Sequence, residues 1–336
     1  MPGPSQLKYV DHRSPGITRR RQGRYWQYFD ASGKRITDRD EIDRLNGIGL
    51  PPAYRDAWFS PDPRGHIQAI GHDDRGRKQY RYHPDFREKQ EAAKYERCTE
   101  FGKVLPKLRR RVAADLRKRT LSRDTVVAAV IRLLDSGRIR VGNEAYVQSN
   151  KSYGATTLRN RHAKVFGRTV KMRFKAKSGI ERELRITDST LSRIVRKCQD
   201  LPGQHLFQYL DEDGIPHPVT STDVNDYIRE ATGEDFTAKH FRTWTASVIA
   251  FEQLCAAGEE GISLKQMLEP VAEALGNTPA ISRKSYVHPA IVEAVKEAPA
   301  RRLSLQCPRS TKYLSSAERG LIAFLGRKTP RKRKAA

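Results

Sequence analysis

The alternation of hydrophobic and polar positions predicts a β-rich region at the start of the chain. Residues 23–37 hold two aromatic runs around an Asp-Ala-Ser-Gly turn, a pattern typical of a β-hairpin. Residues 66–84 predict a second hairpin, with Asp-Asp-Arg-Gly as its turn. Residues 38–49, between the two, predict a short capped helix that ends at a glycine. These elements predict one β-rich domain over residues 1–85.

The pattern changes to a helical period after residue 85. Residues 125–137 are apolar almost all round, which predicts a central helix that begins at Ser122 or Asp124 and has Gly137 as its C-cap. The helix before it carries many basic residues and an apolar stripe at helical spacing, formed by Leu105, Leu108, Val112 and Leu116.

A second β-rich patch at residues 156–187 interrupts the helical part. Val170, Met172 and Phe174 alternate with basic residues, which predicts a strand with one buried face. Lys-Ser-Gly at 177–179 supplies the turn to the next strand.

The resulting fold class is α+β. We expect a small β-rich N-terminal domain at residues 1–85 and a larger, mainly helical domain with a small sheet at residues 86–326. Residues 310–336 end in a basic tail at residues 327–336 that we expect to be disordered.

Charge adds the first indication of a partner. The 336 residues include 64 Lys and Arg against 39 Asp and Glu, so the formal net charge is +25. Six of the bases lie in the last ten residues, so most of the excess belongs to the rest of the chain. So much positive charge favours a polyanionic partner. Nucleic acid is the leading interpretation and an anionic membrane surface the second, but no strongly amphipathic terminal helix supports a membrane.

Other classes of protein find no support in the sequence. No apolar run reaches the ~18 residues of a membrane span, and the first residues lack the apolar region of a secretory signal. The four cysteines lie far apart, without Cys or His neighbours at metal-binding spacing. We therefore expect reduced thiols, no metal site, no membrane partner and a cytoplasmic protein.

Four short segments hold the side chains that a tyrosine would need to attack a phosphodiester: RIRVGNEAY (138–146), RFKAKSGIE (173–181), TAKHFRTW (237–244) and LGNTPAISRKSYVHP (275–289). Attack on a phosphodiester develops negative charge on the phosphoryl oxygens, which guanidinium groups stabilise well. The leaving 5′-oxygen needs a proton, which a lysine can supply. A phenol is a nucleophile that forms a phosphate ester reversibly.

In order, spacing and local residues, these segments resemble the type IB DNA topoisomerases, in particular the small poxvirus-like enzymes of bacteria. GRKQYRYH (76–83) also resembles the base-contacting strand of that family's N-terminal domain, so the resemblance covers nearly the whole chain. It implies the catalytic fold that tyrosine recombinases and type IB topoisomerases share. It also implies a C-shaped clamp with one domain on each face of the duplex.

The resemblance also implies five catalytic positions. Arg140 and Arg242 match the two transition-state arginines, and Lys177 matches the general-acid lysine. Tyr286 matches the nucleophile that becomes a 3′-phosphotyrosine. The fifth family position is usually histidine, but this chain has Asn277, whose amide can donate one hydrogen bond and carries no charge.

Each position has a plainer interpretation when it is taken alone. Arg140 and Arg242 could be surface or phosphate-positioning arginines, and Lys177 could be a solvated turn lysine. Tyr286 could be a packed aromatic, and Asn277 before Thr-Pro could be a helix N-cap. Five residues in the family's order favour the catalytic interpretation.

DNA contacts are implied for seven further residues: Arg75, Arg77, Gln79, Tyr80, Tyr82, Tyr146 and Lys239. For Tyr80 and Tyr82, a place in the core of the N-terminal domain is the alternative.

The implied function is relaxation of supercoiled double-stranded DNA. One strand is cleaved through the phosphotyrosine, the free end rotates, and the strand is resealed. The bond energy stays in the phosphotyrosine, so we expect no cofactor, no catalytic metal and no small-molecule substrate. We expect a monomer associated with the nucleoid.

Two alternatives remain open at this stage. A tyrosine recombinase shares the chemistry, but this chain has Lys239 three residues before Arg242, where recombinases have histidine. The β-rich N-terminal region also differs from a helical core-binding domain. A non-enzymatic nucleoid protein fits the charge but gives no reason for Tyr286 and its partners.

Overall fold

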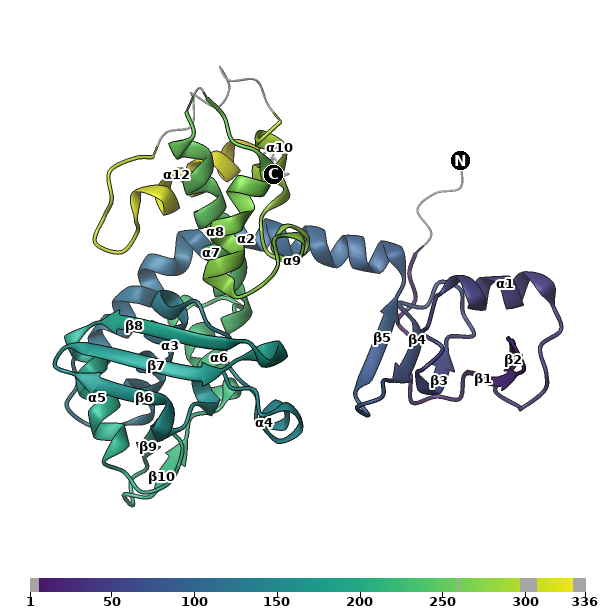
Figure 1. The fold of residues 1–336 in the computed structure, drawn as a ribbon, viewed down its shortest axis with the longest axis horizontal. Helices are drawn as coiled ribbons and strands as arrows, with labels where there is room; N and C mark the ends of the chain where they lie inside the picture. Colours follow the sequence, from purple (N-terminus) through teal and green to yellow (C-terminus); the bar gives the residue numbers. More distant parts are fainter. Residues whose placement is uncertain (1–5, 259, 297–306, 329–336) are drawn as a thin grey trace, which may run out of the picture. The chain divides into compact units, whose positions relative to one another are not determined.

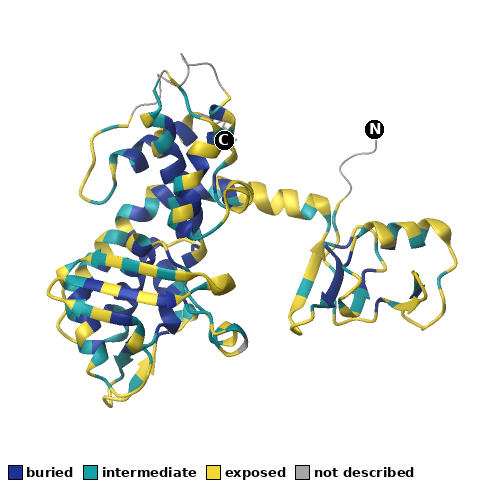
Figure 2. Ribbon diagram, viewed as in Figure 1, coloured by how far each residue is buried: buried dark blue, intermediate teal, exposed yellow. Residues whose placement is uncertain are grey.

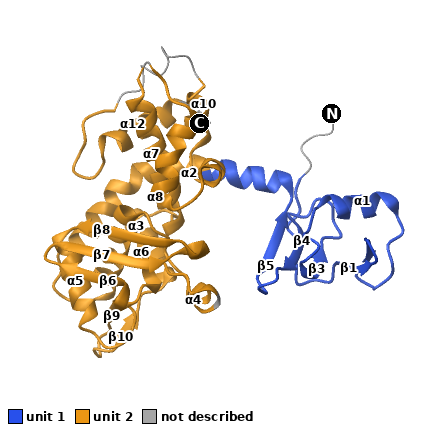
Figure 3. Ribbon diagram, in the orientation of Figure 1, with its two compact units in different colours: residues 1–94 blue, residues 95–336 orange. Residues whose placement is uncertain are grey.

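The computed structural model describes residues 6–258, 260–296 and 307–328. The chain forms two compact units, residues 1–94 and 95–336 (Figure 3). The predicted α+β class is confirmed: the first unit is built on an antiparallel sheet and the second is mainly helical (Figure 1). The domain limits at residues 85 and 326 stay a prediction.

The first unit is a five-stranded antiparallel sheet with strand order β2-β1-β3-β4-β5. A short helix and a small apolar cluster that includes Tyr28, Leu45 and Phe59 complete it. Its elements are β1 (Ile17–Gln22), β2 (Tyr25–Phe29), α1 (Arg39–Gly47), β3 (Arg55–Phe59), β4 (Ile67–His72) and β5 (Lys78–Tyr82).

Of the three elements predicted in this unit, the second hairpin and the short helix are confirmed. β4 and β5 pair across the Asp-Asp-Arg-Gly turn, and α1 begins after Asp38, whose side chain accepts a hydrogen bond from the Asp40 amide. The hairpin expected at residues 23–37 is only partly correct. β2 pairs mainly with β1, and beyond the Asp-Ala-Ser-Gly turn only an isolated bridge joins Phe29 to Arg35.

The long helix α2 (Pro84–Asp115) runs from the first unit into the second. The other helices of the second unit are α3 (Arg123–Gly137), α4 (Glu144–Asn150), α5 (Ser189–Gln199), α6 (Ser221–Thr232), α7 (Ala238–Ala256), α8 (Leu264–Leu275), α9 (Pro279–Ser285), α10 (Pro289–Ala294) and α12 (Ser316–Lys328). Three single-turn helices are η1 (Ala155–Thr157), η2 (Asn160–His162) and η3 (Lys177–Gly179).

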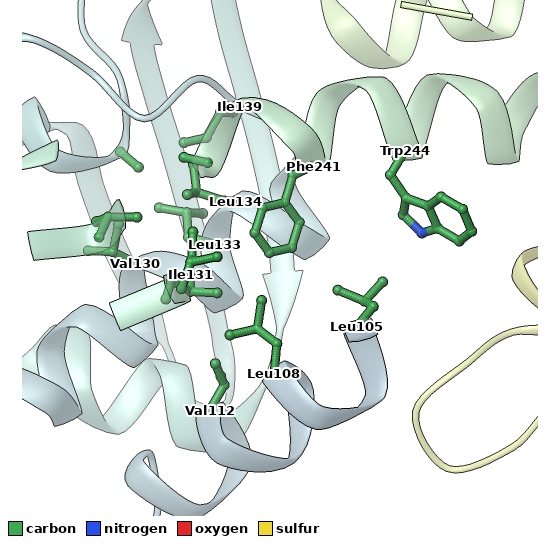
Figure 4. Close-up of a cluster of buried hydrophobic side chains, with 14 of the residues drawn as sticks. Leu105, Leu108, Val112, Val130, Ile131, Leu133, Leu134, Ile139, Phe241 and Trp244 are labelled. Carbon is green, nitrogen blue, oxygen red and sulfur yellow. The ribbon is translucent and has the colours of Figure 1, made fainter. Parts of the chain in front are cut away.

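The core of this unit forms where α2, α3 and α7 meet (Figure 4). The predicted apolar stripe of α2 is fully buried, and α3 is buried on nearly all sides, as its composition predicted. Gly102 of α2 lets the Trp244 ring of α7 pack closely, since a Cβ at Gly102 would lie 2.3 Å from that ring.

A three-stranded antiparallel sheet in the order β6-β7-β8 lies against α5 and α3. Its strands are β6 (Ala163–Phe166), β7 (Thr169–Lys175) and β8 (Glu181–Thr187), and a small hairpin is formed by β9 (Gln208–Leu210) and β10 (Pro216–Pro218). The predicted alternation in β7 is confirmed: Val170, Met172 and Phe174 are buried and the basic residues between them are exposed (Figure 2).

Two local expectations are wrong. Gly137 is the last residue of α3, and the C-cap is Arg138, which adopts the left-handed conformation with φ 56°. The disorder expected at residues 327–336 is wrong for residues 327 and 328, which end α12, a helix that packs on α7 through buried Leu321 and Leu325. Residues 329–336 lie outside the described residues.

In the described part of the chain, no helix combines the length and apolar character that a membrane span requires.

Candidate active site

The loop after α3 places Arg140 through close backbone contacts. The amide of Ala155 donates to the carbonyl of Arg140 at 2.9 Å. Gly154 allows this approach, because a Cβ there would lie 2.7 Å from the Arg140 carbonyl oxygen and 2.5 Å from the amide nitrogen of Gly142. The path of the Arg140 backbone is therefore fixed by a glycine that lies 14 residues later in the chain.

Arg242 lies on the inner side of α7 and is only 7% exposed, so the interpretation as a surface arginine is wrong. Its two terminal nitrogens donate to the carbonyls of Arg138 and Leu275, both at 3.1 Å. The guanidinium thus joins the ends of α3 and α8. Its Nε is buried and has no hydrogen-bond partner among the described residues.

Tyr286 follows the end of α9 and leaves the helical conformation, with φ −134° and ψ −39°. Ser247 of α7 holds the backbone here: its hydroxyl donates to the Tyr286 carbonyl at 3.4 Å and accepts from the His288 amide at 3.0 Å. The ring is half-buried against the core, and its centroid lies 5.0 Å from the guanidinium carbon of Arg242.

The charges around Tyr286 favour the ionised phenol. Burial on its own raises the pKa of Tyr286, but the charges and hydrogen bonds of Arg242 and Arg140 outweigh it and hold the pKa below its usual value. Burial, and then the charge of Arg140, lowers the pKa of the Arg242 guanidinium to about 10. Arg242 is still charged at neutral pH, so the half-buried phenol lies beside positive charge.

Asn277 is tied directly to this group. Arg140 Nη2 donates to Asn277 Oδ1 at 3.0 Å, which leaves the amide nitrogen pointing elsewhere. That nitrogen is buried and has no hydrogen-bond partner among the described residues. The interpretation of Asn277 as a helix N-cap is wrong, because Thr278 is the N-cap of α9 and its hydroxyl accepts from the Ile281 amide.

Lys177 stands apart from the other four candidates. It is exposed in η3, the turn between β7 and β8, and makes no hydrogen bond or ion pair with any described residue. The turn itself is formed by the amide of Ala176, which donates to the Ile180 carbonyl at 2.8 Å.

Arg182 is a further basic residue at this site that the sequence did not single out. It donates from both terminal nitrogens to the carbonyls of Glu273 and Ala274, at 3.0 and 2.8 Å. Burial, and then the charge of Arg140, lowers the pKa of Arg182. A signal existed: Arg182 shares the inner face of β8 with Leu184 and Ile186, where an arginine is unusual.

In the first unit, Tyr80 and Tyr82 lie on β5 and are 38% and 40% exposed, so the interpretation as core residues is wrong. Their rings stack with centroids 5.9 Å apart, and Tyr82 also stacks on Phe86. Gln79 Nε2 and Arg77 Nε both donate to Asp73, and Arg75 is exposed in the same turn. Exposed rings beside basic side chains suit contact with a nucleic acid.

The other two candidates for DNA contact, Tyr146 and Lys239, are also exposed. Tyr146 is 52% exposed on α4, which is anchored at its start where Glu144 pairs with Arg159 at 2.6 Å. No cluster of metal-ligating side chains occurs within the described ranges.

Comparison with known proteins decides the family. The sequence model described as "Eukaryotic DNA topoisomerase I, catalytic core" matches residues 83–303, and "Bacterial DNA topoisomerase IB, N-terminal domain" matches residues 25–73. The chain is 32% identical to DNA topoisomerase 1B of Acanthamoeba polyphaga mimivirus over 290 residues, which cover 82% of this chain and 86% of the relative. The chain belongs to the type IB DNA topoisomerases.

More distant relatives agree with this assignment. DNA topoisomerase 1B of vaccinia virus (strain Copenhagen) is 23% identical over 73% of this chain and 76% of its own length. DNA topoisomerase 1 of Mycosarcoma maydis is 24% identical over 52% of this chain and 19% of its own length. The family membership decides against the recombinase and against the non-enzymatic nucleoid protein.

Proposed function

We propose that this enzyme relaxes supercoiled double-stranded DNA, with Tyr286 as the nucleophile. The observation that carries the proposal is the position of the Tyr286 phenol beside two guanidinium groups, those of Arg242 and Arg140, which together lower its pKa. A phenol that was only a packed aromatic would need neither positive charge. The cations favour the phenolate that attacks phosphorus.

Cleavage then follows from the arrangement of the site. The Tyr286 oxygen forms a bond to phosphorus, and the bond from phosphorus to the 5′-oxygen breaks, which leaves a 3′-phosphotyrosine and a free 5′-hydroxyl. Negative charge gathers on the non-bridging oxygens, where Arg140 and Arg242 supply charged donors. The unpartnered amide nitrogen of Asn277 supplies a neutral donor beside them.

Lys177 is the proposed proton donor to the leaving 5′-oxygen. Its exposure in the turn leaves its ammonium available to a bound DNA strand. Religation is the reverse: the 5′-hydroxyl gives its proton back to Lys177 and attacks phosphorus, and Tyr286 leaves. The phosphodiester energy is retained in the phosphotyrosine, so neither a nucleotide nor a catalytic metal enters the scheme.

We also propose that the two units close on the duplex as a clamp. Tyr80 and Tyr82 of one unit, and Tyr146 and Lys239 of the other, would then contact DNA. We further propose that the enzyme acts as a monomer on the bacterial nucleoid in the cytoplasm. The net charge of +25 supports the polyanionic partner.

A plasmid assay tests the proposal. Supercoiled plasmid is incubated with the enzyme, without ATP and with a metal chelator, and the products are separated by gel electrophoresis. We expect a ladder of relaxed topoisomers and, after denaturation with SDS, a covalent protein–DNA adduct. Tyr286→Phe removes only the phenolic oxygen and should abolish both products while DNA binding stays. An adduct formed by the Phe variant would show that another residue is the nucleophile.

A further inference from the structure

The hairpin that carries Lys177 extends beyond the sheet from which it grows. β6 pairs with β7 only as far as Ala163 opposite Met172. The last three pairs of β7 and β8, which end at Lys175 opposite Glu181, have no third strand beside them. A two-stranded extension of this kind is held weakly by its own pairing. The position of Lys177 at its tip therefore depends on contacts outside the sheet.

Phe174 is buried in the core, and the Lys175 carbonyl accepts from the Tyr153 amide at 2.8 Å. Arg182 adds the side-chain hydrogen bonds that tie this extension to α8. It lies on β8 opposite Phe174, five residues after Lys177. Its terminal nitrogens donate to the carbonyls of Glu273 and Ala274, in the last turn of α8. Carbonyls at the end of a helix lack partners within the helix and carry partial negative charge, so a cation is favoured there.

The end of α8 is a rigid anchor. Gly276 adopts the left-handed conformation with φ 61°, and its amide and that of Asn277 donate to carbonyls of the last turn. The guanidinium of Arg182 packs against Gly276, since a Cβ there would lie 3.3 Å from Nη1. Asn277 is the residue after Gly276. Arg182 thus connects the Lys177 hairpin to the segment that holds the Asn277 amide.

We infer that Arg182 is a positioning residue that holds Lys177 where it can protonate the leaving 5′-oxygen. The inference rests on the proposed role of Lys177 as proton donor. Both terminal nitrogens of Arg182 are used on the two carbonyls, so its bonds set a distance between hairpin and helix. A general acid must lie within hydrogen-bonding distance of the atom that it protonates, and a displacement of ~1 Å can slow a reaction by about 10²-fold.

The contact requires arginine in particular. The planar fork of a guanidinium reaches two carbonyls on successive residues at once, whereas an ammonium group is a single point of charge. Arg173, which also lies on the extension, differs because it pairs with Glu181 of the same hairpin and is exposed. Arg173 therefore does not link the hairpin to another element.

The test compares leaving groups. Single-turnover cleavage is measured at saturating enzyme on a normal duplex and on one with a 5′-bridging phosphorothiolate, because a thiolate leaves without a proton. On the normal duplex we expect Arg182→Ala to be about 10- to 100-fold slower than wild type. On the sulfur substrate most of this loss should disappear. Arg182→Lys keeps the charge but cannot bridge both carbonyls, and it should show the same pattern in a milder form.

Three controls make the outcome decisive. Lys177→Ala, measured in parallel, should show the same sulfur rescue, and Arg182→Ala/Lys177→Ala should be no slower than Lys177→Ala alone. Arg185 is an exposed residue of the same strand, and its side chain makes no hydrogen bond or ion pair with a described residue, so Arg185→Ala should cleave both substrates like wild type.

Rescue of Lys177→Ala without rescue of either Arg182 variant would overturn the positioning role alone. Absence of rescue in Lys177→Ala would overturn the proton-donor role and the inference with it.

Discussion

Arg140 Nη2 donates a 3.0 Å hydrogen bond to Oδ1 of Asn277, a residue 137 positions further along the chain. In the proposed mechanism, this bond determines which end of the amide is left for the reacting phosphate. The oxygen is occupied by Arg140, so the buried and unpartnered nitrogen is the end that remains to donate. We therefore propose that Asn277 takes the place of the family's usual histidine without carrying a charge.

The first prediction concerns this amide. Asn277→Ala should slow single-turnover cleavage by about 10-fold or more, because one donor to the phosphoryl oxygens is removed. Asn277→His should stay active, since an imidazole can donate from a similar place. Asn277→Asp is the matched control: it has the size of Asn and still accepts from Arg140, but it has no donor and adds negative charge. It should be at least as slow as the Ala variant. Wild-type cleavage by Asn277→Ala would exclude the amide from the reaction.

The second prediction concerns the glycine that shapes the backbone of Arg140. Gly154→Ala places a Cβ within 2.7 Å of the Arg140 carbonyl oxygen, so the loop that holds Arg140 must shift. We expect slower cleavage at saturating DNA, by about 10-fold or more for a displacement approaching 1 Å. Gly326→Ala, where a Cβ meets nothing within 4 Å, is the control and should cleave normally. Equal rates for the two variants would mean that the loop adapts without moving the guanidinium.

The third prediction concerns the attachment of α12. Glu318 accepts from Trp244 Nε1 at 3.0 Å and pairs with Arg109 at 2.8 Å, and its side chain is 8% exposed. Glu318→Gln should lower the free energy of unfolding by about 1–3 kcal/mol, because buried donors lose a charged acceptor. Glu269→Gln, which removes an exposed charge 3.9 Å from Lys265, should change it little. Urea unfolding at pH 7 measures both variants. Equal stabilities would show that α12 is held by its apolar contacts alone.

The ion pair between Glu318 and Arg109 also predicts that the free energy of unfolding depends on pH. Burial on its own raises the pKa of Glu318, but the hydrogen bonds and charge of Arg109 outweigh it, so the pKa lies below the usual value. A lowered pKa contributes stability that is present above about pH 4.3 and is lost as the pH falls through the folded-state pKa. The difference in unfolding free energy between wild type and Glu318→Gln should therefore shrink in acid. A difference that is constant from pH 7 to pH 3 would contradict the ionised pair.

The fourth prediction concerns the basic end of the chain. Deletion of residues 329–336 removes four bases and leaves α12 intact. If these bases neutralise phosphates outside the active site, the slope of log K against log salt should flatten by about 0.9 for each phosphate that the shortened protein no longer neutralises. Cleavage by enzyme already bound to DNA should not change, because all five proposed catalytic positions lie upstream. Superimposable salt titrations of the two proteins would remove this segment from DNA binding.

Local patterns in the sequence were sufficient to predict most of the elements and the family. The alternation in residues 170–174 was sufficient to predict β7 and its buried face, because a strand that covers a core must turn every second side chain inward. The same holds for the β4–β5 hairpin, whose turn residues set its register. Short segments around Arg140, Lys177, Arg242 and Tyr286 carried enough local identity for the family to be named.

Which side-chain atoms contact one another could be seen only in the folded chain. The contact between Arg140 and Asn277, the burial of Arg242 and the bonds of Arg182 to α8 join residues that are far apart in the chain, and no periodicity encodes such contacts. The end of α12 also could not be predicted from composition. Residues 327 and 328 belong to the basic tail that composition predicted to be disordered, but they extend α12, whose buried Leu321 and Leu325 pack on α7.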